Sequence, residues 1–214
     1  MNPILSRLLE EKIVAIVRGI EADSVIKLAE ALASSGIHLI EITCNTPGVA
    51  SMIETVSAAL GDEAVIGAGT VTSTQLAGTV IDAGARYVLA PNLDKAVLDY
   101  CQERAVPMIP GATTCTEILQ ALEYGVEVVK LFPAAALGTS YLKQIRGPLD
   151  DAKIMAVGGV NKGNAAELLA AGADALGIGG SLVSRELVAK GAWDDIRARA
   201  AELVQIVKAA QRNE

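Results

Sequence analysis

ASSGIHLIEI (33–42) and LAAGADALGI (169–178) repeat one pattern of helix end, glycine and apolar run, as do IDAGARYVLA (81–90) and LEYGVEVVKL (122–131). The glycine of each stretch suits the left-handed position that follows the last turn of a helix. The apolar run after it suits a strand that is buried on both faces. Each stretch therefore predicts a helix that leads directly into a buried strand.

The whole chain contains eight such apolar runs. The predicted strands are Ile13–Val17, His38–Thr43, Ala64–Gly69, Arg86–Ala90, Val106–Ile109, Glu127–Leu131, Lys153–Val157 and Asp174–Ile178. Their ends follow one another at roughly 20 to 26 residues, which leaves room for one helix between successive parallel strands. Two of these helices are predicted over Ser24–Ser35 and Ala165–Ala171, and N-caps are expected at Asp23, Thr46, Thr114 and Asn161.

Eight alternating strands and helices predict an α/β fold, the (β/α)₈ or TIM barrel, formed by residues 1–214 as one domain. The alternative is an open, doubly wound parallel sheet. No GxGxxG motif follows the first predicted strand, which weakens that alternative. In a (β/α)₈ barrel the active site lies at the carboxyl ends of the strands, so the reactive residues are expected there.

Composition excludes several classes of function. The chain has 18 Lys and Arg against 25 Asp and Glu, and a net charge of −7 argues against nucleic acid or an anionic membrane as partner. No stretch predicts a membrane-spanning helix, and Met1–Lys12 lacks the features of a signal peptide, so we expect a cytoplasmic protein. One histidine and three cysteines predict neither a disulfide framework nor a metal site. We expect chemistry without a metal or other cofactor.

Lys130 and Glu41 interrupt two apolar strands, in EVVKLFP and LIEIT. A buried lysine loses the hydration of its cation, so its pKa falls and its amine becomes a nucleophile. Alternation along the strand puts Ile40 and Ile42 on one face and Glu41 on the other. If the isoleucines meet the helices, Glu41 points into the barrel. Glu41 and Lys130 can then share one layer, because strands two and six are both even-numbered. A structural ion pair is the alternative.

Two glycine-rich turns follow strands seven and eight, VGGVN (157–161) and GIGGSLV (177–183). Glycines let backbone N–H groups approach an anion, and these barrels often bind phosphate between the same two loops. Asn161 and Ser181 are expected to begin helices there. Arg18 and Thr70 end strands one and three, and the planar guanidinium of Arg18 suits a carboxylate or phosphate.

Six motifs together resemble the KDPG/KHG aldolase family: IEITCNTPG, IGAGTV, LAPNLD, IPGATTCTEI, VVKLFPA and GIGGSLV. These class I aldolases are lyases that cleave 2-keto-3-deoxy-6-phosphogluconate (KDPG) or 4-hydroxy-2-oxoglutarate (KHG). The products are pyruvate and an aldehyde, glyceraldehyde 3-phosphate or glyoxylate. The similarity runs from about Ile13 to Val183. It implies a (β/α)₈ barrel, a homotrimer and a small 2-keto acid substrate that carries a phosphate.

The resemblance also implies roles for individual residues. Lys130 would form a Schiff base with the substrate, and Glu41 would act as acid and base. Further residues would bind the substrate, with the pyruvate moiety at Thr70, Pro91 and Phe132 and the phosphate at Gly158, Gly159, Gly180 and Ser181.

Two positions depart from other members of the family. The loop Cys44–Thr46 lacks the arginine that some members carry, so Arg18 is the candidate partner of the substrate carboxylate. Ala156–Val157 stands where many members have Pro-Thr, which removes a hydroxyl near the phosphate end.

Two other functions fit the same barrel. One is a metal-independent isomerase or epimerase of a sugar phosphate, in which Lys130 acts only through its charge. The other is a trimeric barrel without catalytic activity. A covalent adduct between pyruvate and Lys130 would distinguish the aldolase from both.

Overall fold

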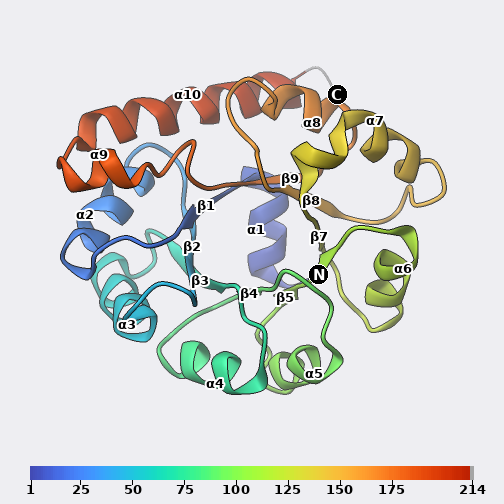
Figure 1. The fold of residues 1–214 in the computed structure, drawn as a ribbon, viewed down its shortest axis with the longest axis horizontal. Coiled ribbons are helices and arrows are strands. Elements are labelled where there is room, and N and C mark those ends of the chain that lie inside the picture. The colour runs from blue at the N-terminus through green and yellow to red at the C-terminus, as the bar shows by residue number, and fades with distance from the viewer. Residues whose placement is uncertain (213–214) are drawn as a thin grey trace.

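The computed structural model describes residues 1–212 and is a barrel of parallel strands inside a ring of helices (Figure 1). The strands are β1 (Ile13–Val17), β2 (Leu39–Thr43), β3 (Val65–Gly69), β4 (Val88–Leu89), β5 (Met108–Ile109), β6 (Gly111–Ala112), β7 (Val129–Leu131), β8 (Ile154–Val157) and β9 (Ala175–Ile178). They neighbour one another in the order β5-β4-β3-β2-β1-β9-β8-β7-β6. Each lies within a predicted strand except β6, and several are shorter than predicted at their first residues.

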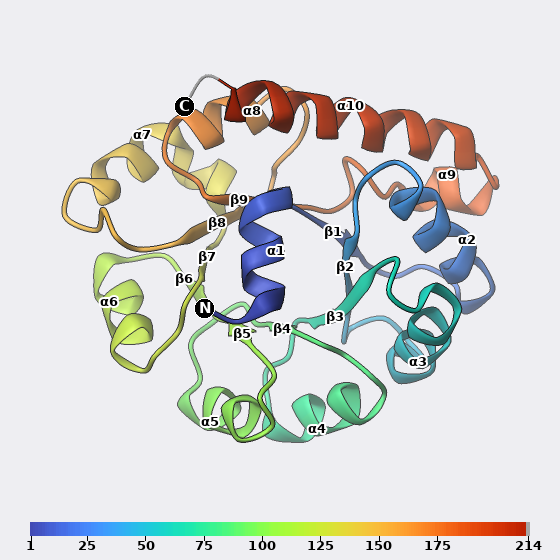
Figure 2. The same ribbon diagram turned by 180° about the vertical axis from the view of Figure 1, so that it is seen from behind.

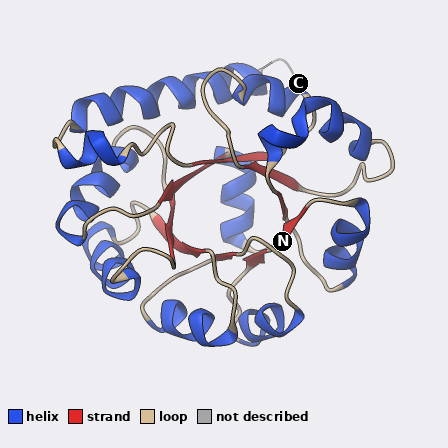
Figure 3. Ribbon diagram, in the orientation of Figure 1, coloured by secondary structure: helices blue, strands red, loops and turns tan. Residues whose placement is uncertain are grey.

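The barrel closes at Pro110, between β5 and β6. Strand β5 pairs with β4, whereas β6 pairs with β7. Proline has no N–H to donate to a strand ladder, so the ladder changes partner at this residue. The two short strands therefore form one barrel strand, which extends beyond the predicted Val106–Ile109. The sheet is a ring (Figure 3), and the open-sheet alternative is wrong.

The helices that follow the strands cover the outside of the barrel. They are α2 (Ala22–Ala33), α3 (Val49–Leu60), α4 (Thr74–Asp82), α5 (Lys95–Glu103), α6 (Cys115–Glu123), α7 (Ala134–Arg146), α8 (Ala165–Ala170), α9 (Arg185–Ala189) and α10 (Trp193–Gln211). Helix α1 (Pro3–Glu11) instead lies across the amino-terminal end of the barrel (Figure 2). No helix in the described part of the chain is long and apolar enough to cross a membrane.

Of the predicted helix caps, Thr114 is confirmed. Its side chain and Glu117 form a capping box at the start of α6. The N-caps of α2, α3 and α8 are instead Glu21, Gly48 and Asn164, so the predictions at Asp23, Thr46 and Asn161 are wrong. Thr46 does not cap α3 because its hydroxyl makes a tertiary contact instead, accepting a hydrogen bond from the N–H of Gly19 (2.9 Å). The four glycines predicted to follow helix ends, Gly36, Gly84, Gly125 and Gly172, all have positive φ, between 81° and 105°.

Apolar side chains fill two separate layers. The larger layer lies between strands and helices and includes Ile40 and Ile42. The smaller layer fills the barrel itself, where Tyr87 packs among aliphatic side chains above Leu5 and Leu8 of α1. Burial of both leucines closes this end of the barrel against water. The opposite end stays open, and the candidate site lies there.

Candidate active site

A cavity of about 710 Å³ opens at the carboxyl ends of the strands. Every predicted site residue except Glu41 lines it, namely Arg18, Thr70, Pro91, Lys130, Phe132, Gly158, Gly159, Gly180 and Ser181. Asn45 and Arg185 line it as well. The predicted residues that line the cavity come from six of the predicted strand ends and Asn45 from a seventh, as expected for an active site of this fold.

Lys130 and Glu41 both lie in the interior of the barrel. Their side chains are 5% and 1% exposed, and the residues on either side of each belong to the buried strands β7 and β2. Ile40 and Ile42 pack outward against the helices, which confirms the inward orientation of Glu41. In the described part of the chain, neither Nζ of Lys130 nor Oε2 of Glu41 has a hydrogen-bond partner. The structure thus does not contain the structural ion pair between them.

Two glycines of β3 make room for side chains inside the barrel. A Cβ at Gly69 would overlap the carboxylate of Glu41, and a Cβ at Gly67 would overlap the ring of Tyr87. Glu41 therefore lies over the carboxyl end of β3, and Tyr87 fills the barrel beneath it. The apparently weak strand sequence VIGAG is what allows a carboxylate and an aromatic ring to share a narrow interior.

Burial shifts the pKa values of Lys130 and Glu41 in opposite directions. Desolvation lowers the pKa of Lys130, and the charge of Arg18 lowers it further, although Glu41 acts the other way. Desolvation raises the pKa of Glu41 against the opposing effects of Lys130 and Arg18. Burial thus favours a neutral amine and a neutral carboxylic acid, the pair needed for nucleophilic addition and proton transfer.

Three further predicted residues line the wall around Lys130. The ring centre of Phe132 lies 5.0 Å from Nζ of Lys130. Thr70 has a φ of +60°, which is strained for a residue with a branched side chain, and it holds this conformation at the end of β3. A Cβ at Gly111 would overlap the carbonyl of Pro91, so these two backbones touch at the cavity edge.

The helices that follow β8 and β9 do not begin at the predicted residues. Residues 180–183 form a turn, and α9 begins only at Arg185, so Ser181 does not start a helix. A turn likewise separates Asn161 from α8. The hydroxyl of Ser181 donates to the carbonyl of Val160 (2.7 Å) and so joins the two loops. Gly158 and Gly159 have φ of +95° and +74°, a conformation that leaves the backbone accessible.

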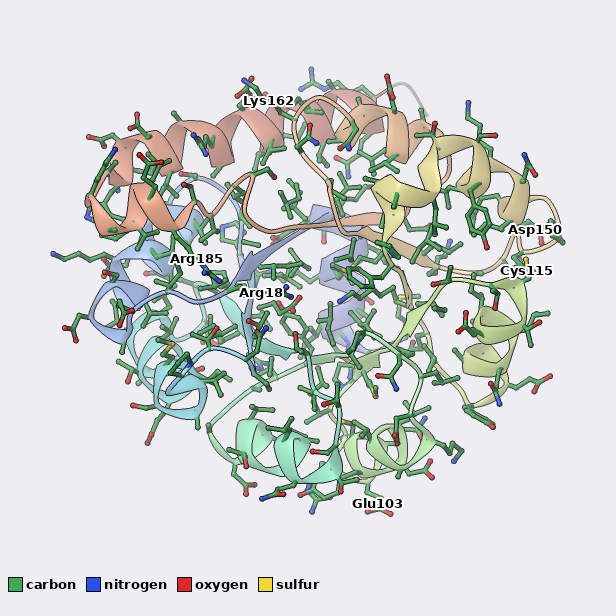
Figure 4. All side chains as sticks on the ribbon, viewed as in Figure 1. Arg18, Glu103, Cys115, Asp150, Lys162 and Arg185 are labelled. Carbon is green, nitrogen blue, oxygen red and sulfur yellow. The ribbon has the colours of Figure 1, made fainter. Side chains whose placement is uncertain are left out.

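Arg18 and Arg185 lie beside each other at the end of β1 (Figure 4). Nε of Arg185 donates to the carbonyl of Arg18 (3.2 Å). Arg185 was not predicted as a site residue, because it precedes Glu186 in a polar helix start that looks solvent-facing. Thr46, which fixes the loop after Arg18 through the N–H of Gly19, was predicted only as a helix N-cap. Neither residue has a local sequence signal for these roles, since both roles depend on contacts between distant loops.

A family model described as KDPG and KHG aldolase matches residues 4–199. The chain belongs to the KDPG/KHG aldolase family. The family membership predicted from the six motifs is confirmed, and the barrel is the one that the family's solved structures have.

Three relatives of this family member illustrate the match. The 2-dehydro-3-deoxy-phosphogluconate aldolase of Treponema pallidum is 32% identical over 97% of this chain and 99% of its own. The 2-dehydro-3-deoxy-6-phosphogalactonate aldolase of Escherichia coli is 33% identical over 79% of this chain and 83% of its own. The KDPG aldolase of Legionella pneumophila, solved with pyruvate as a covalent carbinolamine, superposes with a TM-score of 0.85 at 31% identity, covering 90% of this chain and 93% of that one.

Proposed function

We propose that this protein is a class I aldolase that cleaves a phosphorylated 2-keto-3-deoxy sugar acid, or 4-hydroxy-2-oxoglutarate, to pyruvate and an aldehyde. The observation that carries this proposal is the buried amine of Lys130, which has no hydrogen-bond or ion-pair partner among the described residues, near a buried carboxyl group in an open cavity. The covalent pyruvate adduct of the Legionella relative supports the same chemistry.

The reaction begins when the neutral amine of Lys130 adds to the C2 ketone. Burial lowers the pKa of this amine, so a larger fraction of it is neutral at a given pH than for an exposed lysine. Glu41, whose pKa is raised by burial, gives its proton to the carbinolamine hydroxyl. Water leaves, an iminium forms between Lys130 and C2, and Glu41 becomes a carboxylate.

Cleavage then uses the same two groups. The Glu41 carboxylate takes the proton of the C4 hydroxyl, directly or through a water molecule, and the C3–C4 bond breaks. Its electron pair moves toward the iminium and forms an enamine, while C4 leaves as the aldehyde. Protonation at C3 and addition of water to the resulting iminium release pyruvate and restore the Lys130 amine.

The remaining cavity residues bind the two ends of the substrate in this proposal. The guanidinium of Arg18 holds the substrate carboxylate, and Thr70, Pro91 and Phe132 surround the pyruvate moiety. The loops with Gly158, Gly159, Gly180 and Ser181 receive the phosphate. Because the hydroxyl of Ser181 already donates to Val160, backbone N–H groups are the donors that this loop offers to the phosphate.

The configuration at C4 distinguishes two candidate phosphorylated keto acid substrates. Cleavage converts C4 into the aldehyde carbon, so both epimers release the same aldehyde. The relatives include aldolases of both 6-phosphogluconate- and 6-phosphogalactonate-derived keto acids at similar identity. Val157 lines the cavity at the phosphate end and offers no hydroxyl there. The test is pyruvate release from KDPG, its phosphogalactonate epimer and KHG. Release from none of the three would contradict the proposal.

The family resemblance also supports a homotrimer in the cytoplasm with the whole chain as one barrel domain. Light scattering is expected to give about three times the 22.1 kDa mass of the chain. A single species of one chain mass at micromolar concentration would contradict the trimer.

A further inference from the structure

Two guanidinium groups face this cavity, and neither has an acidic partner among the described residues. In that part of the chain, the arginines that form ion pairs are Arg7, Arg104, Arg146 and Arg197. Arg18 and Arg185 are not among them, although both line the cavity. Glu186, which follows Arg185, instead pairs with Nζ of Lys190 (2.6 Å). In an acidic protein, two uncompensated cations at one cavity indicate a site for anions.

Contacts with the β1 loop hold Arg185 in place. Its Nε donates to the carbonyl of Arg18 (3.2 Å), and its guanidinium lies against Gly19, where a Cβ would overlap it. Gly19 has a φ of +61° and accepts this close approach because it lacks a side chain. Nη1 and Nη2 of Arg185 have no partner among the described residues. The side chain is thus positioned through one nitrogen, while two remain to bind a ligand.

The two arginines differ in their electrostatic effect on the reacting groups. Arg18 is close enough to lower the pKa of both Lys130 and Glu41. Arg185 contributes to neither pKa shift. It begins α9, which follows the glycine turn after β9, and β9 pairs with β1. Arg185 therefore lies beside the proposed phosphate loops, on the side of β1.

A phosphate bound at these loops needs a counter-charge that the backbone cannot supply. Backbone N–H groups provide only partial charges. Two other cations lie near Ser181 and are already engaged: Nη1 of Arg199 donates to the carbonyl of Ser181 (3.4 Å), and Lys162 pairs with Glu202 (3.1 Å). Lys162 and Arg199 line an adjoining hollow and not the main cavity. Among the described residues, Arg185 is the cation of the main cavity whose two terminal nitrogens remain open beside these loops.

We propose that Arg185 binds the phosphate group of the substrate and makes the enzyme prefer phosphorylated aldol substrates. This inference rests on the proposed function and extends it to a residue outside the six family motifs. The planar fork of Arg185 donates two hydrogen bonds to phosphate oxygens, while Arg18 holds the carboxylate at the other end of the same substrate.

The test compares Arg185→Gln with the wild-type enzyme on matched substrates. We expect the KM for KDPG to rise about tenfold, the lower range for a lost charge-assisted hydrogen bond at an exposed side chain. The KM for the unphosphorylated 2-keto-3-deoxygluconate is expected to change less than about twofold. The inhibition constant of inorganic phosphate should rise by about the same factor as the KM for KDPG. Arg185→Lys keeps the charge without the planar fork, so its KM for KDPG should lie between those of the wild type and Arg185→Gln.

Arg197→Gln is the matched control, because it removes one surface arginine that pairs with Asp194 on α10. It should leave all three constants within about twofold of wild type. The inference would be overturned if Arg185→Gln raised the KM for KDPG and for 2-keto-3-deoxygluconate equally. An unchanged inhibition constant for phosphate would overturn it as well.

Phosphate binding by Arg185 can be tested independently of the proposed aldolase activity. If wild-type Lys130 forms no borohydride-stable adduct with pyruvate, the Schiff-base function fails. Calorimetric titration with inorganic phosphate then tests whether Arg185 binds phosphate. Weaker phosphate binding by Arg185→Gln would still support the inference, and unchanged binding would overturn it.

Discussion

The two ends of the barrel differ in whether their polar side chains have hydrogen-bond partners. At the amino-terminal end, Glu11 accepts a hydrogen bond from Arg7 (2.7 Å) and lies 3.1 Å from Nδ1 of His38. Asp174 accepts from the N–H of Ile154 (2.8 Å) at the same end. At the carboxyl end, Lys130 and Oε2 of Glu41 are buried without a hydrogen-bond or ion-pair partner among the described residues.

This difference separates stability from chemistry within one fold. A buried polar group without a partner costs free energy of folding, and at the cavity a bound ligand can supply the contacts that Lys130 and Glu41 lack. The closed end, sealed by α1, stabilises the barrel. At the open end, burial lowers the pKa of Lys130 and raises the pKa of Glu41, which favours the neutral forms that react.

Apart from the removal of Lys130, Glu41→Gln should lower the activity more than any other substitution at the open end. The amide keeps the shape but cannot exchange a proton, so kcat should fall by about 10²–10⁴. Loss of a negative charge should also move the pKa of Lys130 downward, because Glu41 raises it. A steady-state assay of pyruvate release checks the rate, and circular dichroism checks the fold. Turnover within about threefold of wild type would assign Glu41 a structural role.

Leu8→Ala should produce the opposite result at the closed end. This side chain is 1% exposed under the barrel, so its truncation should cost about 2–5 kcal/mol of unfolding free energy. The KM and kcat of the folded fraction should stay unchanged. Urea unfolding measures the loss, and Leu9→Ala is the matched control, since half-buried Leu9 on the same helix should cost clearly less. A large change in KM would show that the ends are not independent.

Arg18→Ala should raise the KM for keto acid substrates by about tenfold or more, because a charge-assisted contact to the carboxylate is lost. Arg18→Lys should already impair the enzyme, since lysine lacks the planar fork. Arg18 lowers the pKa of Lys130, so its removal should shift the pH midpoint of adduct formation upward, opposite to Glu41→Gln. An unchanged KM with an unchanged pH profile would direct attention to Asn45 and Thr70.

Glu11→Gln should have the smallest effect. Its partners Arg7 and His38 are each about one-third exposed, and such pairs contribute on the order of 0.2–1 kcal/mol. Chemical denaturation should show a loss within that range, and kcat should not change. A loss of activity without a loss of stability would contradict the division between the two ends.

The fold was predictable from sequence where local and global signals agree. The glycine after each helix and the apolar run behind it were enough to place eight barrel strands. The change of partner at Pro110 was not predictable, because it depends on which neighbouring strand each half meets. Helix α1 was also missed, since its role follows from the barrel opening that it covers.

The site was predictable to the extent that its residues break a pattern. Lys130 and Glu41 stand out as charges within apolar strands, and both reach the interior as expected. Arg185 and Thr46 break no pattern, because a polar residue at a helix start or in a loop is ordinary. The direction of the Ser181 hydroxyl toward Val160 likewise depends on the packing of two loops.

Reduction of the enzyme with borohydride in the presence of pyruvate tests the central claim most directly. Mass spectrometry of the digested protein should find one lactyl-type adduct, on Lys130, and none in Lys130→Met, which should fold normally and show no turnover. The fraction trapped should rise with pH to a midpoint below the usual lysine value of 10.5, because burial lowers the pKa of Lys130. An adduct on another lysine, or no adduct in an enzyme that still releases pyruvate, would contradict the account.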